Sequence, residues 1–247
     1  MIRALLLLAG FAAAWAALVE ATGVPHFILP GPGRVVAAFV DNFAFILENA
    51  AITFAEIVLG MLVGLIAGLG CALTLTLSRT ARAWMLPLMV ASQAIPVFVI
   101  APLLVLWLGY GMASKIAAAA LIIFFPVASS FYDGLARTQA GWLDLARTMG
   151  ASRASMLLRV RFPAALPALA SGVRMAAAVA PIGAVIGEWV GASAGLGFVM
   201  LQSNAQMRVD LMFAALIVLA AFALLFYALV DKAMARLVPW DPRRTDP

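Results

Sequence analysis

The chain has 247 residues, of which 66% are hydrophobic and only 11% are charged. A water-soluble domain carries about 25% charged residues, so this composition excludes that class and predicts a multi-pass membrane protein. The net charge is +5, but the basic residues lie between apolar segments, where they set the orientation of membrane helices and do not indicate nucleic-acid binding. One cysteine, Cys71, and one histidine, His26, predict neither an intrachain disulfide nor a metal site.

Six segments are predicted to cross the ~30 Å hydrocarbon core of a bilayer, which takes about 20 helical residues. They are expected at Ile2–Val19, Ala50–Leu77, Ala83–Leu108, Ile116–Tyr132, from Ala168 to just before Glu188, and at Leu211–Val230. The chain is therefore predicted to be an all-α membrane protein with six transmembrane helices. The first segment also resembles a secretory signal peptide, because Arg3 precedes an apolar run with small residues, and its cleavage is an alternative.

The segment between the first two spans opens with prolines and glycines, which exclude a membrane helix there. From Val35 to Leu47 apolar residues recur on one side, which predicts an amphipathic helix on the outer surface of the membrane. The second span contains a row of small residues that favours close packing of another helix, namely Gly60, Gly64, Gly68 and Gly70. We find no repeat of 20–50 residues, so residues 1–247 are expected to form one membrane domain.

The positions of lysine and arginine predict the orientation, because positive residues are retained on the cytoplasmic side. With the N-terminus inside, twelve lie in inner segments: Arg3, Arg79, Arg82, Arg137, Arg147, Arg153, Arg159, Arg161, Lys232, Arg236, Arg243 and Arg244. Only Arg34, Lys115 and Arg208 lie in outer segments, and Arg174 is near a membrane boundary. Both termini are therefore expected in the cytoplasm, and residues 133–167 form the largest cytosolic loop.

The cytosolic loop is predicted to contain two short helices that meet at a glycine. Trp142–Met149 has helical propensity, and Gly150 can adopt the left-handed conformation that ends a helix. Ser152 can cap a second helix that runs to about Arg161. An arginine-rich loop that only follows the charge bias is the alternative interpretation.

Apolar side chains lie among the arginines of this loop and would be poorly covered in water. They are Leu143, Leu145, Ala146, Met149, Met156, Leu157 and Val160. A groove on a partner protein would cover them. Pro163 and Pro167 are expected to break the backbone before the fifth span and so to form a rigid hinge between the loop and that helix.

The loop resembles the EAA loop of binding-protein-dependent ABC transporter permeases. In that family Glu-Ala-Ala, three residues, Gly-Ala and a later apolar-Pro pair form the helix that docks on the ATPase subunit. Here the matching residues are Asp144, Leu145 and Ala146, then Gly150 and Ala151, then Phe162 and Pro163. Asp144 keeps the acid and Leu145 keeps the apolar character, so these two departures bear on the details of the contact. The residues that the resemblance assigns to coupling are Asp144, Leu145, Ala146, Met149, Gly150, Ala151, Arg153, Met156 and Leu157, with Pro163 and Pro167 as the hinge.

The resemblance extends over nearly the whole chain, from FILPGPGRVVAAF through SQAIPVFVIAPLLVLWLGYG to EWVGASAGLGFVMLQSNAQMRVDLMFAALIVL. The chain looks most like the nitrate/sulfonate/taurine group and, within it, like permeases for hydroxymethylpyrimidine or formylaminopyrimidine, which are pyrimidine precursors of thiamine. The resemblance implies the type I ABC importer (MetI-like) fold and a location in the bacterial inner membrane. It also implies three kinds of partner: a second copy of the permease, two ABC ATP-binding subunits, and a periplasmic or lipid-anchored solute-binding protein.

No energy source is visible in the chain. A phosphate-binding loop needs G-x-x-x-x-G-K-[ST], whereas the two lysines, Lys115 and Lys232, follow Ser114 and Asp231. ATP and magnesium are therefore expected in a partner ATPase, and this chain is expected to be a transport subunit with no catalytic residue, metal or cofactor of its own.

Four polar residues inside predicted spans are candidates for the substrate pathway. Glu56 and Glu188 need an explanation because a charged side chain at the centre of a bilayer costs ~2.5–3.5 kcal/mol. An interfacial carboxylate is an equal alternative for each, although the glycines after Glu188 predict a re-entrant outer element that lines a cavity. Ser92 and Gln93 lie one turn before Pro96 and could face a channel or form a helix–helix hydrogen bond.

An amide and carboxylates among these candidates favour a heterocyclic amine or alcohol as the solute. Two carboxylates would repel an oxyanion such as nitrate or a sulfonate, and few cations are expected in the pathway. We expect alternating access, in which closure of the ATP-binding subunits moves the loop from Asp144 to Arg161. An ion-coupled secondary transporter, which an uncoupler would stop while ATP remains, and a non-transporting scaffold are alternatives of other classes.

Overall fold

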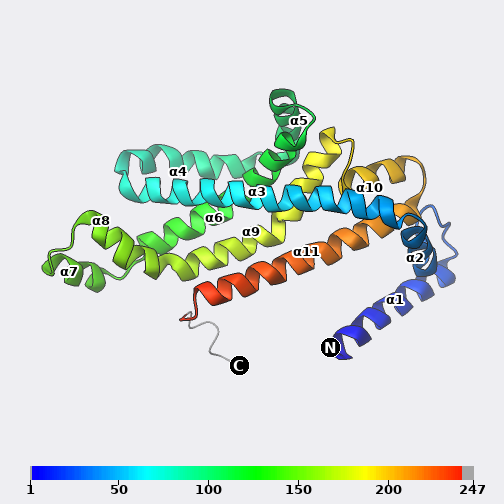
Figure 1. Ribbon diagram of the computed structural model, residues 1–247, viewed down its shortest axis with the longest axis horizontal. Helices are drawn as coiled ribbons and strands as arrows, with labels where there is room; N and C mark the ends of the chain where they lie inside the picture. The colour runs from blue at the N-terminus through cyan, green and yellow to red at the C-terminus, as the bar shows by residue number, and fades with distance from the viewer. Residues whose placement is uncertain (1, 241–247) are drawn as a thin grey trace. The chain divides into compact units, whose positions relative to one another are not determined.

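The computed structural model describes residues 2–240 of the chain (Figure 1). Every regular element within that range is helical, which confirms the all-α prediction. The helices form two compact units that are described separately here, Met1–Ala55 with Ala192–Phe222 and Glu56–Gly191 with Ala223–Pro247. Arg243 and Arg244 of the predicted inner segments lie outside the described residues.

Most of the predicted spans correspond to long apolar helices. Among the described residues, four helical runs are long and apolar enough to cross a membrane, or five if one bent pair is counted as a span. They are α3 (Phe43–Leu77), α6 (Met112–Ala136), the run Arg153–Gly191 that includes α9 (Phe162–Gly191), α11 (Val209–Leu237), and the bent pair α4 (Arg79–Ala94) with α5 (Val97–Leu108). The first predicted span is also helical, as α1 (Ile2–Thr22), of which Ala9–Thr22 is a shorter apolar helix. The predicted count of six agrees approximately with this arrangement.

The third predicted span is not one straight helix. It is bent by 104° between α4 and α5, so the span predicted over Ala83–Leu108 is a bent pair of helices. Pro96 has no backbone N–H and disfavours the helical conformation at Ile95, which is extended at φ −95° and ψ 114°. Figure 1 shows the consequence, because α5 turns sharply away from the direction of α4.

In the first unit, a short helix precedes the long span. α2 (Pro32–Asp41) ends at Asn42, whose side-chain amide donates a 2.8 Å hydrogen bond to the carbonyl oxygen of Ala38. Asparagine favours such helix ends because its side chain competes with the backbone for hydrogen bonds. The amphipathic helix expected over Val35–Leu47 is therefore present only as far as Asp41, since α3 already begins at Phe43. On α1, Trp15 packs on Phe213 of α11, with ring centroids 5.7 Å apart.

In the second unit, the glycine row of α3 packs directly on α6. A Cβ atom added to Gly60, Gly64 or Gly68 would lie 2.5, 2.6 or 2.8 Å from a side-chain carbon of α6. The carbon atoms that these added Cβ atoms would meet belong to Ala119, Ile123 and Val127. The predicted close approach of another helix is confirmed for these three glycines, whereas an added Cβ at Gly70 would meet no atom within 4 Å.

Gly64→Ala is expected to destabilise the permease by about 1–3 kcal/mol, because Ile123 is β-branched and cannot swing its methyl group aside. Gly70→Ala is the matched control in the same helix and is expected to be neutral or slightly stabilising, since alanine favours helix. The measurement is the free energy of unfolding in mixed detergent micelles. Equal effects of the two replacements would contradict the packing argument.

Candidate functional site

The loop that follows α6 folds as the predicted helix–turn–helix. α7 (Ala140–Thr148) ends before Gly150, which has φ +76°, and α8 (Arg153–Met156) begins after Ser152. The hydroxyl oxygen of Ser152 accepts a 3.2 Å hydrogen bond from the backbone N–H of Ser155. Both local signals, a left-handed glycine and a serine N-cap, are therefore confirmed.

The chain remains helical from the loop into the membrane helix. A π-helical turn, Leu157–Arg161, follows α8, and the helical run Arg153–Gly191 is continuous over 39 residues. The expected backbone break at Pro163 and Pro167 is therefore wrong. Proline is tolerated inside membrane helices, where neighbouring groups satisfy the freed carbonyl oxygens, and Pro87, Pro126 and Pro181 also lie inside helices of this chain. α8 and the π turn are thus the first part of one long helical run.

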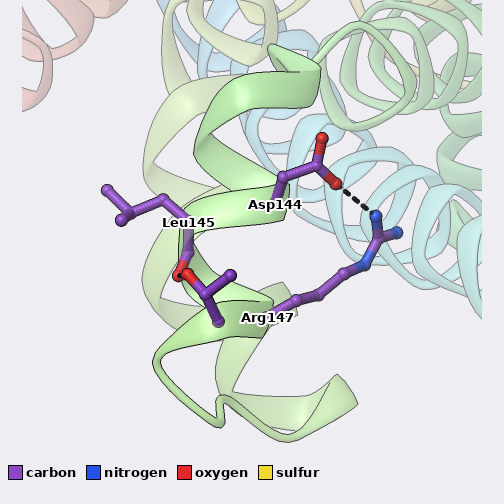
Figure 2. Close-up of polar contacts among 4 residues, drawn as sticks. Asp144, Leu145 and Arg147 are labelled. Carbon is purple, nitrogen blue, oxygen red and sulfur yellow. Dashed lines mark hydrogen bonds and ion pairs between the residues drawn. The ribbon is translucent and has the colours of Figure 1, made fainter.

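The coupling residues predicted in α7 divide between two faces. Ala146 is buried, whereas Leu145 and Met149 are 61% and 78% exposed. Figure 2 shows Asp144 and Arg147 on one side of α7, joined by an ion pair of 2.6 Å, with the side chain of Leu145 pointing the other way. An exposed apolar pair on a short helix is a surface that a partner groove would cover.

The remaining coupling residues lie around the turn between the two helices. Gly150 and Arg153 are exposed, and Ala151, Met156 and Leu157 are half-buried. An added Cβ at Gly150 would meet no atom within 4 Å, so only its backbone conformation restricts that position. The conformation of the turn is therefore set by the left-handed glycine and by the helix caps on either side of it.

The two glutamates of the predicted pathway meet in the second unit. Glu56 of α3 and Glu188 of α9 are 2% and 1% exposed. The Glu56 carboxyl interacts with that of Glu188 through a side-chain hydrogen bond and through charge. It also interacts electrostatically with the ammonium group of Lys115. One carboxyl oxygen of Glu56 is buried without a hydrogen-bond partner. The sequence prediction singled out both residues but not their contact.

Lys115 is the cation of this cluster and is buried in α6, with 4% of its surface exposed. Its ammonium group donates hydrogen bonds to the carbonyl oxygens of Tyr110, of Gly111 at 3.0 Å and of Gly191 at 3.0 Å. It thereby ties the start of α6 to the end of α9. Gly187 permits this approach, because an added Cβ would lie 2.9 Å from the Cα of Lys115.

The role of Lys115 was not predicted from the sequence. The residue was expected in an outer segment, and few cations were expected in the pathway, whereas Lys115 lies with the two glutamate candidates. The available signal was the position of a single lysine just inside an apolar helix, since a buried ammonium group needs partners.

The segment after Glu188 breaks as the glycines predict. α9 ends at Gly191, and α10 (Leu196–Ala205) begins after Gly195. In the first unit, the backbone N–H of Gly195 donates to the side-chain oxygen of Asn49 at 2.7 Å, and that of Leu196 donates to the hydroxyl oxygen of Thr53 at 2.8 Å. These two side chains of α3 cap the start of α10.

Ser92 and Gln93 lie in the last turn of α4, immediately before the bend. The hydroxyl of Ser92 donates to the carbonyl oxygen of Met89 at 2.7 Å, and the amide of Gln93 lies 3.4 Å from the Ser92 hydroxyl. Both side chains are exposed in the described chain. The structure gives them hydrogen bonds within α4 and none with Glu56, so the four pathway candidates form two separate groups.

One further ion pair was not predicted. The guanidinium of Arg174 on α9 donates to the carboxylate of Asp231 on α11 at 2.7 Å. It pairs an arginine that the sequence placed only near a membrane boundary. Among residues 2–240 no three His, Cys, Asp or Glu side chains lie close enough together to hold a metal ion.

Comparison with known proteins shows what this arrangement is similar to. Residues 60–240 match the model of a family described as binding-protein-dependent transport system inner membrane component. A probable ABC transporter permease protein of Haemophilus influenzae is 49% identical over 238 residues, which are 96% of this chain and 97% of the relative. The formylaminopyrimidine transport permease protein ThiX of Halalkalibacterium halodurans is 34% identical over 231 residues, 93% of this chain and 92% of the relative.

A solved structure shares the fold. A chain of the MetNI methionine ABC transporter in an inward-facing conformation superposes with a TM-score of 0.68 at 20% sequence identity. The match covers 79% of this chain and 97% of that chain. Together with the helical elements described above, this likeness confirms the predicted MetI-like fold.

Proposed function

Because the chain belongs to the binding-protein-dependent transport system inner membrane component family, and is thus the permease subunit of an ABC importer, we propose that its α7–α8 loop couples it to ATP-binding subunits. The observation that carries this proposal is the exposed apolar pair Leu145 and Met149 on α7. These side chains would be covered when α7 lies in a groove of the ATPase, with Gly150 and Ala151 at the turn.

The proposed assembly contains two ATP-binding subunits, a second copy of this permease and a solute-binding protein outside the cell. Both termini and the α7–α8 loop lie in the cytoplasm, as the charge distribution predicts. ATP and magnesium bind the partner subunits. This chain supplies the path and makes or breaks no bond in the solute.

In the proposed mechanism, closure of the ATP-binding subunits moves α7 and α8, and the continuous helical run Arg153–Gly191 carries that movement along α9. Pro163 and Pro167 lie inside this rod, next to the π turn Leu157–Arg161, where the helix bends most easily. Glu188 lies near the C-terminal end of α9, and Lys115 of α6 contacts that end through Gly191. Movement of the rod would therefore reach the buried charged cluster, and with it Glu56.

For the solute, we propose a pyrimidine precursor of thiamine, such as formylaminopyrimidine or hydroxymethylpyrimidine. The support is the 34% identity to a permease with that named substrate over 93% of this chain. A sulfonate, taurine or nitrate is the second candidate. It gains from the buried ammonium of Lys115 beside Glu56 and Glu188, which offsets the repulsion of an anion.

Uptake by proteoliposomes that contain the permease, its ATP-binding subunits and its binding protein distinguishes these solutes. We expect ATP-dependent accumulation of the pyrimidine, no inhibition by excess taurine, and no effect of an uncoupler. Accumulation of taurine alone would replace the solute and keep the importer. Uptake that stops with the uncoupler while ATP remains would overturn the proposal of ATP coupling.

Gly150→Val is expected to lower both co-purification of the ATP-binding subunit and ATP-dependent uptake by about tenfold or more, because a β-branched residue is strained at φ +76°. Gly150→Asn is the matched control, since asparagine tolerates this conformation, and it is expected to retain both. Full retention of co-purification and uptake by the valine variant would remove the docking role from this turn.

A further inference from the structure

Five arginines surround one pocket at the end of the second unit, between the turn from α3 to α4 and the π turn before α9. The pocket has a volume of about 740 Å³ and is lined by Arg79, Arg82, Arg147, Arg153 and Arg161, among others. We call it the arginine pocket. Within residues 2–240 only Arg147 of these five forms an ion pair, with Asp144. The pocket therefore concentrates positive charge that the described chain does not neutralise.

The chemistry of this lining selects a phosphate group. Guanidinium groups present parallel N–H donors that match two oxygens of one phosphate, and they stay charged at every physiological pH. Like charges around a common space also repel one another, so an anion between them removes an unfavourable interaction. Arg79 and Arg82 belong to α4, Arg153 belongs to α8, and Arg161 belongs to the π turn.

A second pocket lies beside the arginine pocket. It has a volume of about 430 Å³ and shares Arg79 and Arg82 with the arginine pocket, but its other lining residues are Ala83, Leu86 and Pro87. We call it the apolar groove. Trp84 and Leu88 are exposed on the same helix. A soluble phosphate or an acidic peptide has no acyl chain to bury in such a groove. A phospholipid, in contrast, places its head group on cations and an acyl chain along apolar side chains.

We propose that the arginine pocket and the apolar groove together bind one anionic phospholipid, with its phosphate between Arg79, Arg82 and the loop arginines and an acyl chain along Leu86 and Pro87. The proposal requires that the chain lies in a membrane and does not depend on the transported solute. In the orientation proposed above, the lipid belongs to the cytoplasmic leaflet. It joins α4 to the α7–α8 loop and so limits how far the loop can move.

The test uses the full-length permease, purified in detergent and examined by native mass spectrometry with added lipids. The probes are phosphatidylglycerol and phosphatidylcholine with identical acyl chains, and glycerol 3-phosphate as the soluble head group. We expect phosphatidylglycerol to bind at least about tenfold more tightly than phosphatidylcholine, and the head group alone to bind far more weakly than the lipid.

Arg79→Gln with Arg82→Gln is expected to weaken phosphatidylglycerol binding by about tenfold or more, to the level of phosphatidylcholine. Lys232→Gln with Arg236→Gln removes the same charge from exposed positions of α11 and is expected to leave the preference intact. Arg79→Lys with Arg82→Lys keeps the charge and is expected to retain most of the binding. If the lysine variant keeps its binding, the loss in the glutamine variant comes from the missing charge and not from misfolding.

Four results would overturn the proposal. Equal affinity for the two lipids would remove the phosphate selectivity, and equal losses in the α4 and α11 variants would reduce it to net charge. Binding of glycerol 3-phosphate as tight as that of the lipid would assign the pocket to a soluble phosphate. If the bound ATP-binding subunit displaces phosphatidylglycerol, the arginines serve an acidic surface of that partner instead. None of these results depends on uptake, so the proposed transport function is tested separately.

Discussion

Lys115→Met is expected to lower the free energy of unfolding of the permease by about 3–5 kcal/mol. The replacement keeps the volume and the apolar stem of the side chain but removes the ammonium group that lies with Glu56 and Glu188. It also removes the donor to the carbonyl oxygens of Gly111 and Gly191. The measurement is unfolding of the purified chain in mixed micelles, compared with wild type at the same detergent composition.

A second replacement separates charge from hydrogen bonding. Glu56→Gln in the Lys115→Met background removes one carboxyl group from the cluster and is expected to recover part of the lost stability. A coupling energy between the two positions of about 0.5–3 kcal/mol would show that the residues interact directly. If the double variant is no more stable than Lys115→Met alone, the carbonyl contacts of Lys115 account for the loss. If Lys115→Met is as stable as wild type, the contacts of Lys115 in this cluster do not stabilise the fold.

The features that the sequence predicted correctly depend on neighbours along the chain. Gly150 and Ser152 act within one helical turn of the residues that they cap, and their roles follow from backbone conformation and a single hydrogen bond. The glycines of α3 share one face because of the helical period, so their packing role is visible before the partner helix is known. The long apolar helices follow from composition in the same way.

The features that the sequence missed depend on contacts between distant segments or on competing local effects. Lys115, Glu56 and Glu188 come from three helices, and no local pattern brings them together. Proline alone also predicts too little, because Pro96 lies at a bend of 104° whereas Pro163 and Pro167 lie in a continuous helical run. Pro126 and Pro181 also lie inside continuous helices, so a proline in an apolar span does not by itself show where the chain bends.

The site residues also divide into those that local patterns predict and those that depend on distant contacts. The helix–turn–helix of the loop could be predicted because its signals are contiguous in the sequence. The structure places Leu145 and Met149 outward and Ala146 inward, and the coupling role of these residues stays a prediction. The pathway candidates were chosen one by one for their polarity. Polarity inside an apolar span indicates that a residue has partners, but it does not identify them.

Leu145→Asn with Met149→Gln is expected to abolish the complex with the ATP-binding subunit and to reduce ATP-dependent uptake to background, while the permease itself folds normally. Both side chains are more than half exposed, so the near-isosteric polar replacements disturb no core. Covering two such apolar side chains in a partner groove contributes about 1.5–3 kcal/mol each, and their joint loss would weaken binding by a hundredfold or more.

Leu145→Met with Met149→Leu is the matched control, because it exchanges the two apolar side chains while it keeps their burial in a partner. We expect this variant to retain the complex and most of the uptake, since apolar replacements of similar volume cost less than about 1.5 kcal/mol. Co-purification in detergent reports docking, and uptake by proteoliposomes reports coupling. If the polar variant loses uptake but keeps the complex, Leu145 and Met149 transmit movement and do not hold the partner. If it keeps both the complex and the uptake, α7 is excluded as the docking helix.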